Sequence, residues 1–238
     1  MQQLPKEFAG RMVRTVLFIG LVAACCAGVA TFGMLVASKF NLTTSRNQVP
    51  LTSVKIEGEK VLIPENGKTT REAGWTLRNS RGQYILTLDE LEAGSLDTAE
   101  PVIEVEGDLI LQLKKDTISH LESQGPVIKK GTGTLTIRGE GSLELESADA
   151  EAISSDWNGE ELDADHPSAV RLEAGNLTFT GAGSGIVDET VELAGAQGTI
   201  TATSTSGAAV KTAHVKREGS NSDKLELIGA TAVAVPES

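Results

Sequence analysis

The chain has 238 residues, of which 39% are hydrophobic, so it can bury a core and hold one or two domains. Its formal net charge is −12; residues 1–40 carry a balance of +3, which leaves −15 on residues 41–238. A surface this acidic repels the phosphate backbone, so nucleic acid is excluded as an expected partner.

The N-terminal region contains a long uncharged segment. Residues 15–37 have no charged side chain, and a helix of that length, at about 1.5 Å per residue, covers a hydrocarbon layer of about 30 Å. Lys6, Arg11 and Arg14 form the heavier positive flank, which should stay in the cytoplasm. The sequence therefore predicts a cytoplasmic N-terminus at 1–14, a transmembrane signal-anchor helix at 15–37 and a C-terminal body outside the cell membrane.

Two other interpretations of this segment remain open. Residues 22–25, Val-Ala-Ala-Cys, match the lipobox of bacterial lipoproteins, in which Cys25 would be lipidated. Small residues at 36–38 also suit a signal peptidase, although the apolar stretch is longer than that of a usual signal peptide. Both cysteines, Cys25 and Cys26, lie here, so the body has neither a disulfide nor a thiolate metal site.

Strand signals begin after a polar linker at 38–50. Residues 51–56 alternate apolar with polar side chains, as expected for a half-buried strand. Further strands are predicted at 60–64, 75–77 and 84–88. We expect loops at 65–74 and at 89–100, the latter with a helical turn as its alternative.

One short pattern, a strand followed by a glycine turn and a second strand, is repeated along the body. Residues 101–103 lead through Gly107 to 109–111, and 126–128 lead through two glycines to 135–137. Such a unit, which recurs at intervals of about 20 to 30 residues, is typical of a solenoid, in which each turn buries its apolar face against its neighbours. Fainter copies follow at 169–179, 190–201 and 209–210.

The fold class predicted for 51–238 is therefore all-β, a parallel β-helix (β-solenoid) ectodomain preceded by one transmembrane helix. A β-sandwich built from the same strands is the alternative. The side chains that we expect in the core are Val102, Leu109, Leu111, Val127, Leu135, Ile137, Leu143, Leu145, Leu172, Leu177, Phe179, Ile186, Val191, Leu193 and Ile200.

Three glycine-bounded segments carry a resemblance to a known family. They are GDLILQL from Gly107, GTLTIRGEGSLELES from Gly133 and GNLTFTGAGSGI from Gly175, with YILTLDELEAGS from Tyr84 before them. This series resembles the bacterial cell-surface carbohydrate-binding domains that fold as right-handed parallel β-helices, and it covers about half of the chain. The resemblance implies a non-catalytic surface module, and the best-known members bind acidic plant polysaccharides with calcium.

The longest repeat interval contains an acidic insertion at 149–167. Asp156, Glu160, Glu161, Asp163 and Asp165 supply closely spaced oxygen ligands of the kind that calcium prefers, although their order is not that of an EF-hand. A solvated acidic loop is the other interpretation. Trp157 and Asn158 stand in the same insertion as the expected ligand-binding residues, since an exposed indole can stack on a sugar ring; a Trp157 that pins the loop to the solenoid is the alternative.

No catalytic arrangement is evident in the sequence. His120, His166 and His214 lie far apart, and no nucleophile stands in a credible context with a base. The protein is therefore expected not to be an enzyme but to bind polysaccharide or cell-wall glycan at the cell surface, with calcium as the expected cofactor. The alternative is a structural or assembly protein of the cell envelope that contacts other proteins.

Overall fold

A computed structural model describes residues 48–160, 167–218, 225–228 and 231–234. The chain divides into two units, 1–47 and 48–238, and the predicted cytoplasmic segment, anchor helix and most of the linker lie outside the described residues. Among the residues that are described, none belongs to a helix with the length and apolar character of a membrane span.

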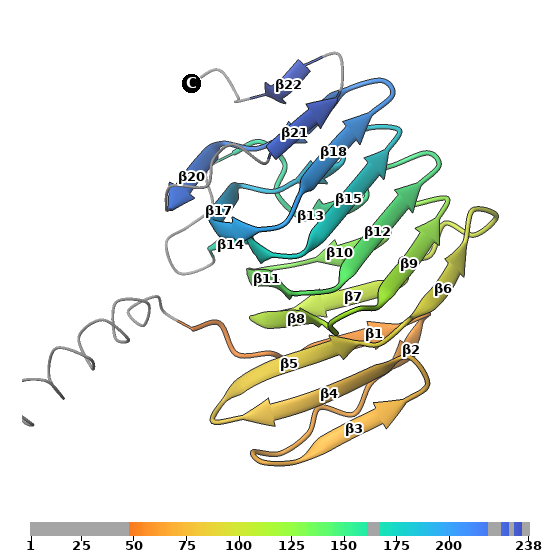
Figure 1. Cartoon of the computed structure of the whole chain (residues 1–238), viewed down its shortest axis with the longest axis vertical. Coiled ribbons are helices and arrows are strands. Elements are labelled where there is room, and N and C mark those ends of the chain that lie inside the picture. Colours follow the sequence, from red (N-terminus) through yellow and green to blue (C-terminus); the bar gives the residue numbers. More distant parts are fainter. Residues whose placement is uncertain (1–47, 161–166, 219–224, 229–230, 235–238) are drawn as a thin grey trace, which may run out of the picture. The chain divides into compact units, whose positions relative to one another are not determined.

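The body is an all-β parallel solenoid of about five turns, as the repeats predict. In each turn the chain passes through one strand of each of three sheets, which we call B, C and A in that order (Figure 1). The β-sandwich alternative is wrong, because successive turns pair in parallel through hydrogen bonds instead of forming two facing antiparallel sheets.

Sheet A contains the strands that close each turn. Its parallel register aligns Ile103, Ile128 and Ile153 in one row, which continues with Ile186 and Val210. In order across the sheet, the strands are β2 (Glu59–Lys60), β1 (Ser53–Ile56), β7 (Ile103–Glu106), β10 (Ile128–Lys130), β13 (Ile153–Ser155), β16 (Ile186–Val187), β19 (Ala208–Lys211) and β22 (Thr231–Ala234).

Sheet B opens each turn. Leu86, Leu111 and Ile137 occupy one buried row, which continues with Leu172. In order across the sheet, the strands are β20 (His214–Glu218), β17 (Thr190–Gln197), β14 (Ser168–Ala174), β11 (Gly133–Gly139), β8 (Leu109–Leu113), β5 (Gln83–Leu88), β4 (Trp75–Ser80) and β3 (Thr69–Glu72).

Sheet C lies between the other two in each turn. The first two copies of the sequence repeat pass from sheet A to sheet B, whereas the copies at 169–179 and 190–201 pass from sheet B to sheet C. The strands of sheet C run side by side in Figure 1, with Leu121, Leu145 and Phe179 aligned in a buried row. In order across the sheet, the strands are β21 (Leu225–Ile228), β18 (Ile200–Ser204), β15 (Asn176–Gly181), β12 (Ser142–Ser147), β9 (Ile118–Ser123) and β6 (Glu92–Ser95).

The two-residue alternation of strand side chains separates the core from the surface. Along β8, Leu109 and Leu111 are buried while Ile110 and Gln112 are partly exposed, because successive side chains of a strand point to opposite faces. Every expected core residue is buried except Leu193, which is partly buried and packs against the same cluster. The predicted core is therefore confirmed at every position but one.

The N-terminal strands differ from the turns that follow. β1 pairs with β7 in an antiparallel sense, and β3, β4 and β5 form an antiparallel meander. Here the sequence predictions are partly wrong: β3 lies within the expected loop at 65–74, β6 lies within 89–100, and 61–64 contains no strand. The meander adds strands at the β5 edge of sheet B.

Sheet A passes into sheet B at a place that we call the A–B corner, and the two N-terminal corners, after β7 and β10, require glycine. Gly133 has a φ of 94°, and a Cβ there would lie 2.6 Å from the carbonyl carbon of Gly107 in the turn before. Gly107 itself has a φ of 104°, and its Cβ would meet the carbonyl oxygen of Pro50 at 2.2 Å. Neighbouring turns can approach closely at this corner only without side chains.

With β5, β6 and β7 counted as the first turn, the longest interval between turns separates the third (β11, β12 and β13) from the fourth (β14, β15 and β16). β13 occupies 153–155 within the predicted insertion, and Ala152 and Ile153 are fully buried, so this part belongs to the stack. The segment between β13 and β14 therefore runs from 156 to 167, at the A–B corner. Despite the added length, β11 and β14 remain in register on either side of it.

Candidate functional site

The acidic insertion is only partly described. Asp156 and Glu160 are exposed, whereas Glu161, Asp163 and Asp165 lie outside the described residues. Within the described ranges, no three histidine, cysteine, aspartate or glutamate side chains are grouped so that they could hold a metal ion. The predicted calcium site thus remains a prediction that depends on residues 161–166.

Trp157 is buried, with an exposed fraction of 5%. Its indole Nε1 donates a hydrogen bond of 2.6 Å to the carbonyl oxygen of Glu160, and its backbone N–H donates to Ser155 Oγ at 3.2 Å. Asn158 is exposed, and its Oδ1 accepts a hydrogen bond of 3.0 Å from Glu160 N. The indole therefore pins the start of the insertion and offers no face to a sugar ring, which decides between the two interpretations of Trp157.

The other aromatic side chains of the body are also covered. Trp75 and Phe179 are buried and Tyr84 is partly buried. In the part of the chain that the structure describes, the body has no platform of exposed rings. Any glycan would therefore be held by polar side chains rather than by stacking.

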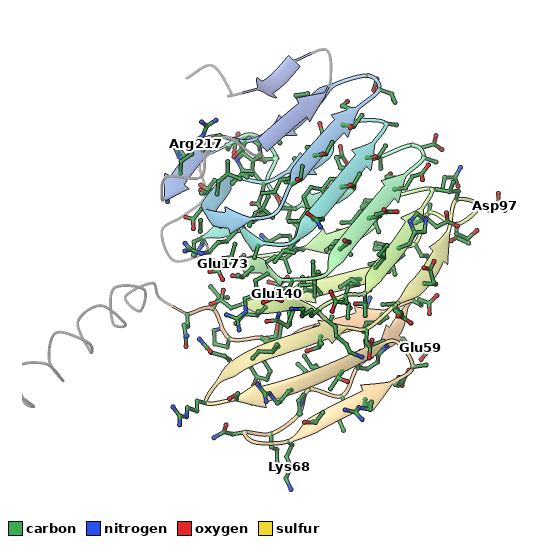
Figure 2. The ribbon with its side chains drawn as sticks, in the orientation of Figure 1. Glu59, Lys68, Asp97, Glu140, Glu173 and Arg217 are labelled. Carbon is green, nitrogen blue, oxygen red and sulfur yellow. The ribbon has the colours of Figure 1, made fainter. Side chains whose placement is uncertain are left out.

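The outer surface of sheet C carries aligned polar rows. Strand pairing places His120 beside Glu144 and Glu144 beside Thr178, while a second row places Glu122 beside Glu146. Figure 2 shows side chains projecting along these strands, with Glu140 in the turn that leads into β12. We call this surface the sheet C face and define it by Glu92, His120, Glu122, Glu144, Glu146, Thr178, Thr180, Thr201 and Thr203.

The sheet C face has an acidic part and a hydroxyl part. His120 lies between two carboxylates, with Nε2 3.6 Å from Glu122 Oε2 and Nδ1 3.5 Å from Glu144 Oε2. Further along the solenoid, Thr178 and Thr180 pair with Thr201 and Thr203, which continues the two rows with hydroxyl groups. The face thus presents acceptors beside groups that both donate and accept hydrogen bonds.

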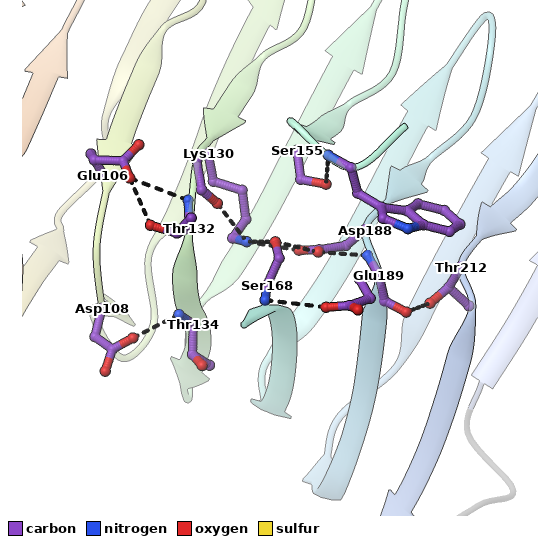
Figure 3. A network of polar contacts seen from close by, with 12 residues as sticks. Glu106, Asp108, Lys130, Thr132, Thr134, Ser155, Ser168, Asp188, Glu189 and Thr212 are labelled. Carbon is purple, nitrogen blue, oxygen red and sulfur yellow. Dashed lines mark hydrogen bonds and ion pairs between the residues drawn. The ribbon is translucent and has the colours of Figure 1, made fainter. Parts of the chain in front are cut away.

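A second polar group lies inside the solenoid, at the A–B corner (Figure 3). Lys130, Ser168 and Asp188 are 1%, 3% and 0% exposed. Lys130 Nζ lies 2.9 Å from Asp188 Oδ2 and donates a hydrogen bond of 2.5 Å to Ser168 Oγ. Ser168 Oγ in turn donates to Asp188 Oδ1 at 2.6 Å. We call these three residues the buried triad.

The two oxygens of Asp188 have different surroundings. Oδ1 accepts hydrogen bonds from Ser168 Oγ and, at 2.7 Å, from the backbone N–H of Glu189. Oδ2 faces Lys130 Nζ at 2.9 Å but accepts no hydrogen bond of good geometry from any described residue. Burial raises the pKa of Asp188 above its usual value of 3.8, although the charge of Lys130 and the hydrogen bonds from Ser168 and Glu189 act in the opposite direction.

Neighbouring acidic residues at this corner hold successive turns together. Glu106 Oε1 accepts a hydrogen bond of 2.7 Å from Thr132 Oγ1. Asp108 Oδ1 accepts one of 2.7 Å from the backbone N–H of Thr134, and its Oδ2 accepts another from Val49 N at 3.1 Å. Part of the acidic character of the chain therefore serves the fold.

Sequence reasoning missed the buried triad and the rows on sheet C. The alternation from Ile128 through Lys129 to Lys130 points Lys130 inward, so this lysine could have been identified from the strand period. Asp188 and Ser168 carry no such signal, because their positions depend on how the fourth turn is stacked after the insertion. The rows on sheet C required the register between turns.

Comparison with known proteins adds no identification. No protein-family model, curated protein or solved structure matches the chain. The function must therefore be inferred from the surfaces of the solenoid.

Proposed function

We propose that residues 51–238 form a non-catalytic extracellular module that binds a polysaccharide or cell-wall glycan, held at the cell membrane by residues 15–37. The observation that carries this proposal is the sheet C face. It extends over strands from successive turns. Its carboxylates and hydroxyls are of the kinds that can hydrogen-bond to sugar hydroxyls.

The spacing of the sheet C face suits an extended polymer. Neighbouring strands lie about 4.8 Å apart, and alternate residues of one strand are separated by about 6.6 Å, so the outward side chains form a regular grid. Carboxylates of Glu144 and Glu146 accept hydrogen bonds from hydroxyl groups, and the hydroxyls of Thr178 and Thr201 both donate and accept. A chain of repeating sugars could hydrogen-bond to these rows in successive turns, first to carboxylates and then to hydroxyls.

The negative charge of the body means that neutral and acidic glycans would bind in different ways. A neutral polymer can contact the sheet C face directly. An acidic polymer would meet glutamates of like charge and would need a cation between them. The proposed calcium cofactor would instead hold an acidic polymer at the acidic insertion, a separate site whose described members are Asp156 and Glu160.

The absence of exposed rings predicts modest affinity for each sugar unit. Hydrogen bonds exchanged with water contribute about 1 kcal/mol each, so binding would depend on several units engaging the rows together. Long polymers should therefore bind more tightly than short oligosaccharides of the same composition.

The experiment that tests the proposal is binding of the purified full chain in detergent to cell-wall polysaccharides, measured by co-sedimentation. The double variant E144Q/E146Q should bind about 10-fold more weakly, equivalent to the loss of about 1.4 kcal/mol. The control variant E59Q/E72Q changes two exposed glutamates outside sheet C and should bind like the wild type. Equal binding by both variants would contradict the assignment to the sheet C face.

Calcium is tested on the same preparation. A ligand that binds only the folded state raises the thermal midpoint, so millimolar calcium should raise it relative to chelator. The rise should disappear in D163A and remain in E59Q. If no rise occurs, calcium is removed from the proposal, while binding of neutral glycans to the sheet C face is unaffected.

Assembly with an envelope protein is the second candidate function. Among the described strands, β20, β21 and β22 each end their sheet on the C-terminal side, so each leaves one backbone edge for an added strand. Self-association or capture of a partner that persists in E144Q/E146Q, without glycan binding by the wild type, would favour this candidate.

A further inference from the structure

We propose that Nζ of Lys130 and the side-chain carboxyl of Asp188 condense to an amide, which cross-links the second and fourth turns of the solenoid. The proposal concerns the interior of the A–B corner and is independent of glycan binding.

The first condition for this reaction is proximity. Nζ lies 2.9 Å from Oδ2, the oxygen bonded to Cγ, so the amine is in contact with the carboxyl group that it would attack; reacting groups are poised at about 3–3.5 Å. Both side chains are held in place: Lys130 also donates to the carbonyl oxygen of Gly131 at 3.2 Å, and Asp188 is fixed through Oδ1. The two groups come from different turns, so the fold itself brings them together.

The second condition is an activated carboxyl group. The hydroxyl of Ser168 and the backbone N–H of Glu189 both donate to Oδ1, where negative charge develops when an amine attacks Cγ. Oδ2 accepts no hydrogen bond from the described residues and faces the amine, as suits the oxygen that leaves. The asymmetry of the two oxygens thus matches their roles in the reaction.

The third condition is exclusion of water. The side chains of Lys130 and Asp188 are 1% and 0% exposed, so an ion pair there lacks hydration and burying its two charges is costly. Burial also raises the pKa of Asp188, which acts against the charged form of its carboxyl. An amide carries no charge, and its formation relieves the cost of burying two ions.

The atoms balance without any co-reactant. One proton passes from Nζ to Oδ2, giving an amine and a carboxylic acid, and the nitrogen lone pair then forms the C–N bond at Cγ. A second nitrogen proton reaches Oδ2, the Cγ–Oδ2 bond breaks and one water leaves. The nitrogen keeps one hydrogen, and the Cγ=Oδ1 double bond is restored beside its two donors.

An exposed pair in the same protein is a matched control. Lys114 Nζ and Asp89 Oδ2 are only 2.6 Å apart, yet their side chains are 54% and 46% exposed. Water stabilises these two ions, and we expect no amide between them. The comparison separates the effect of burial from that of distance.

The test is peptide mapping of the denatured full chain by mass spectrometry. Trypsin should fail to cleave after Lys130 and should release a branched peptide containing Lys130 and Asp188, lighter than the sum of its parts by one water. Asp89 and Lys114 lie on one tryptic peptide, 82–114, which should be cleaved after Lys114 and keep its full mass without loss of water. Unlinked Lys130 and Asp188 peptides from folded wild-type protein would overturn the proposal.

Variants examine the chemistry of the leaving group. D188N should give the same branched product with loss of ammonia instead of water, so its cross-linked peptide should match the wild type in mass. K130R keeps the positive charge and should give no branched peptide. S168A removes one donor to Oδ1 and should lower the fraction of cross-linked protein. An unchanged fraction in S168A would show that Ser168 does not take part in the reaction.

Discussion

The buried triad and the sheet C face use similar side chains in opposite surroundings. Lys130 and Asp188 lie within a closed corner, whereas His120 lies beside Glu144, whose side chain is 52% exposed. In water, an ion pair contributes little because both charges are already hydrated. Inside the solenoid, each buried charge depends on its partner for stabilisation, so removing one of the two groups destabilises the fold. The same burial favours the proposed reaction between the amine and the carboxyl group.

The largest effect is expected when one member of the buried triad is removed. Whether the wild type holds an ion pair or an amide here, D188A leaves the Lys130 amine buried without its partner, which should lower the free energy of unfolding by about 3–5 kcal/mol in urea denaturation. The double variant K130M/D188L should recover much of the loss, because no unpaired charge remains. A double variant no more stable than D188A would contradict this account.

A comparable effect is expected from the core beneath sheet C. F179A removes a fully buried ring from the row that contains Leu145, and the cavity should cost about 3–5 kcal/mol of unfolding free energy. Its neighbour Thr178 points outward, so T178A should change stability by less than about 0.5 kcal/mol. Similar losses in both variants would show that the two faces of β15 are not separated as described.

A pH-dependent effect of intermediate size is expected in K130M, which can form neither the ion pair nor the amide. Losing the charge of Lys130 removes an influence that lowers the pKa of Asp188, so the folded-state pKa rises further above 3.8. Between the unfolded and folded pKa values the folded chain binds more protons, and stability should therefore fall as pH rises, by up to about 1.4 kcal/mol per pH unit.

Urea denaturation of K130M at several pH values measures this slope. K130M/D188L lacks the titrating group and should give a nearly flat profile over the same range. A K130M stability that increases with pH in that range would indicate that Asp188 is ionised in the folded protein.

The smallest effect is expected on the sheet C face. E144Q removes one exposed carboxylate near His120, and the free energy of unfolding should change by less than about 1 kcal/mol. Thermal denaturation at low and high salt measures it. A larger loss would mean that this surface stabilises the fold and would weaken its assignment as a binding surface.

The solenoid could be predicted because its repeats contain local information. The glycine turns and apolar triplets around Ile103 and Ile128 fix where each turn passes from sheet A to sheet B, and alternation then identifies the buried side chains. Sheet C was less evident, since β9 begins at the exposed Ile118 and has no preceding glycine. The antiparallel meander at 69–88 follows hairpin rules instead of the repeat.

The candidate sites required distances between turns. Trp157 is conspicuous in the sequence, yet its burial depends on how the insertion returns to the stack. Lys130 and Asp188 are separated by more than one repeat, so their contact follows from the stacking of three turns. The count of charged residues indicated an acidic surface. It did not show that some carboxylates, such as those of Glu106 and Asp108, accept hydrogen bonds from the next turn and so stabilise the fold.

The contact between Lys130 and Asp188 also has a mechanical meaning. A solenoid pulled from one end can unravel one turn at a time, because each turn is held by its neighbours alone. Lys130 belongs to the second turn and Asp188 to the fourth, and β13 of the third turn lies between β10 and β16. A covalent bond between them would close a loop that contains the strands of the third and fourth turns, β11 to β16, so unravelling by a force applied at the C-terminus would stop at Asp188.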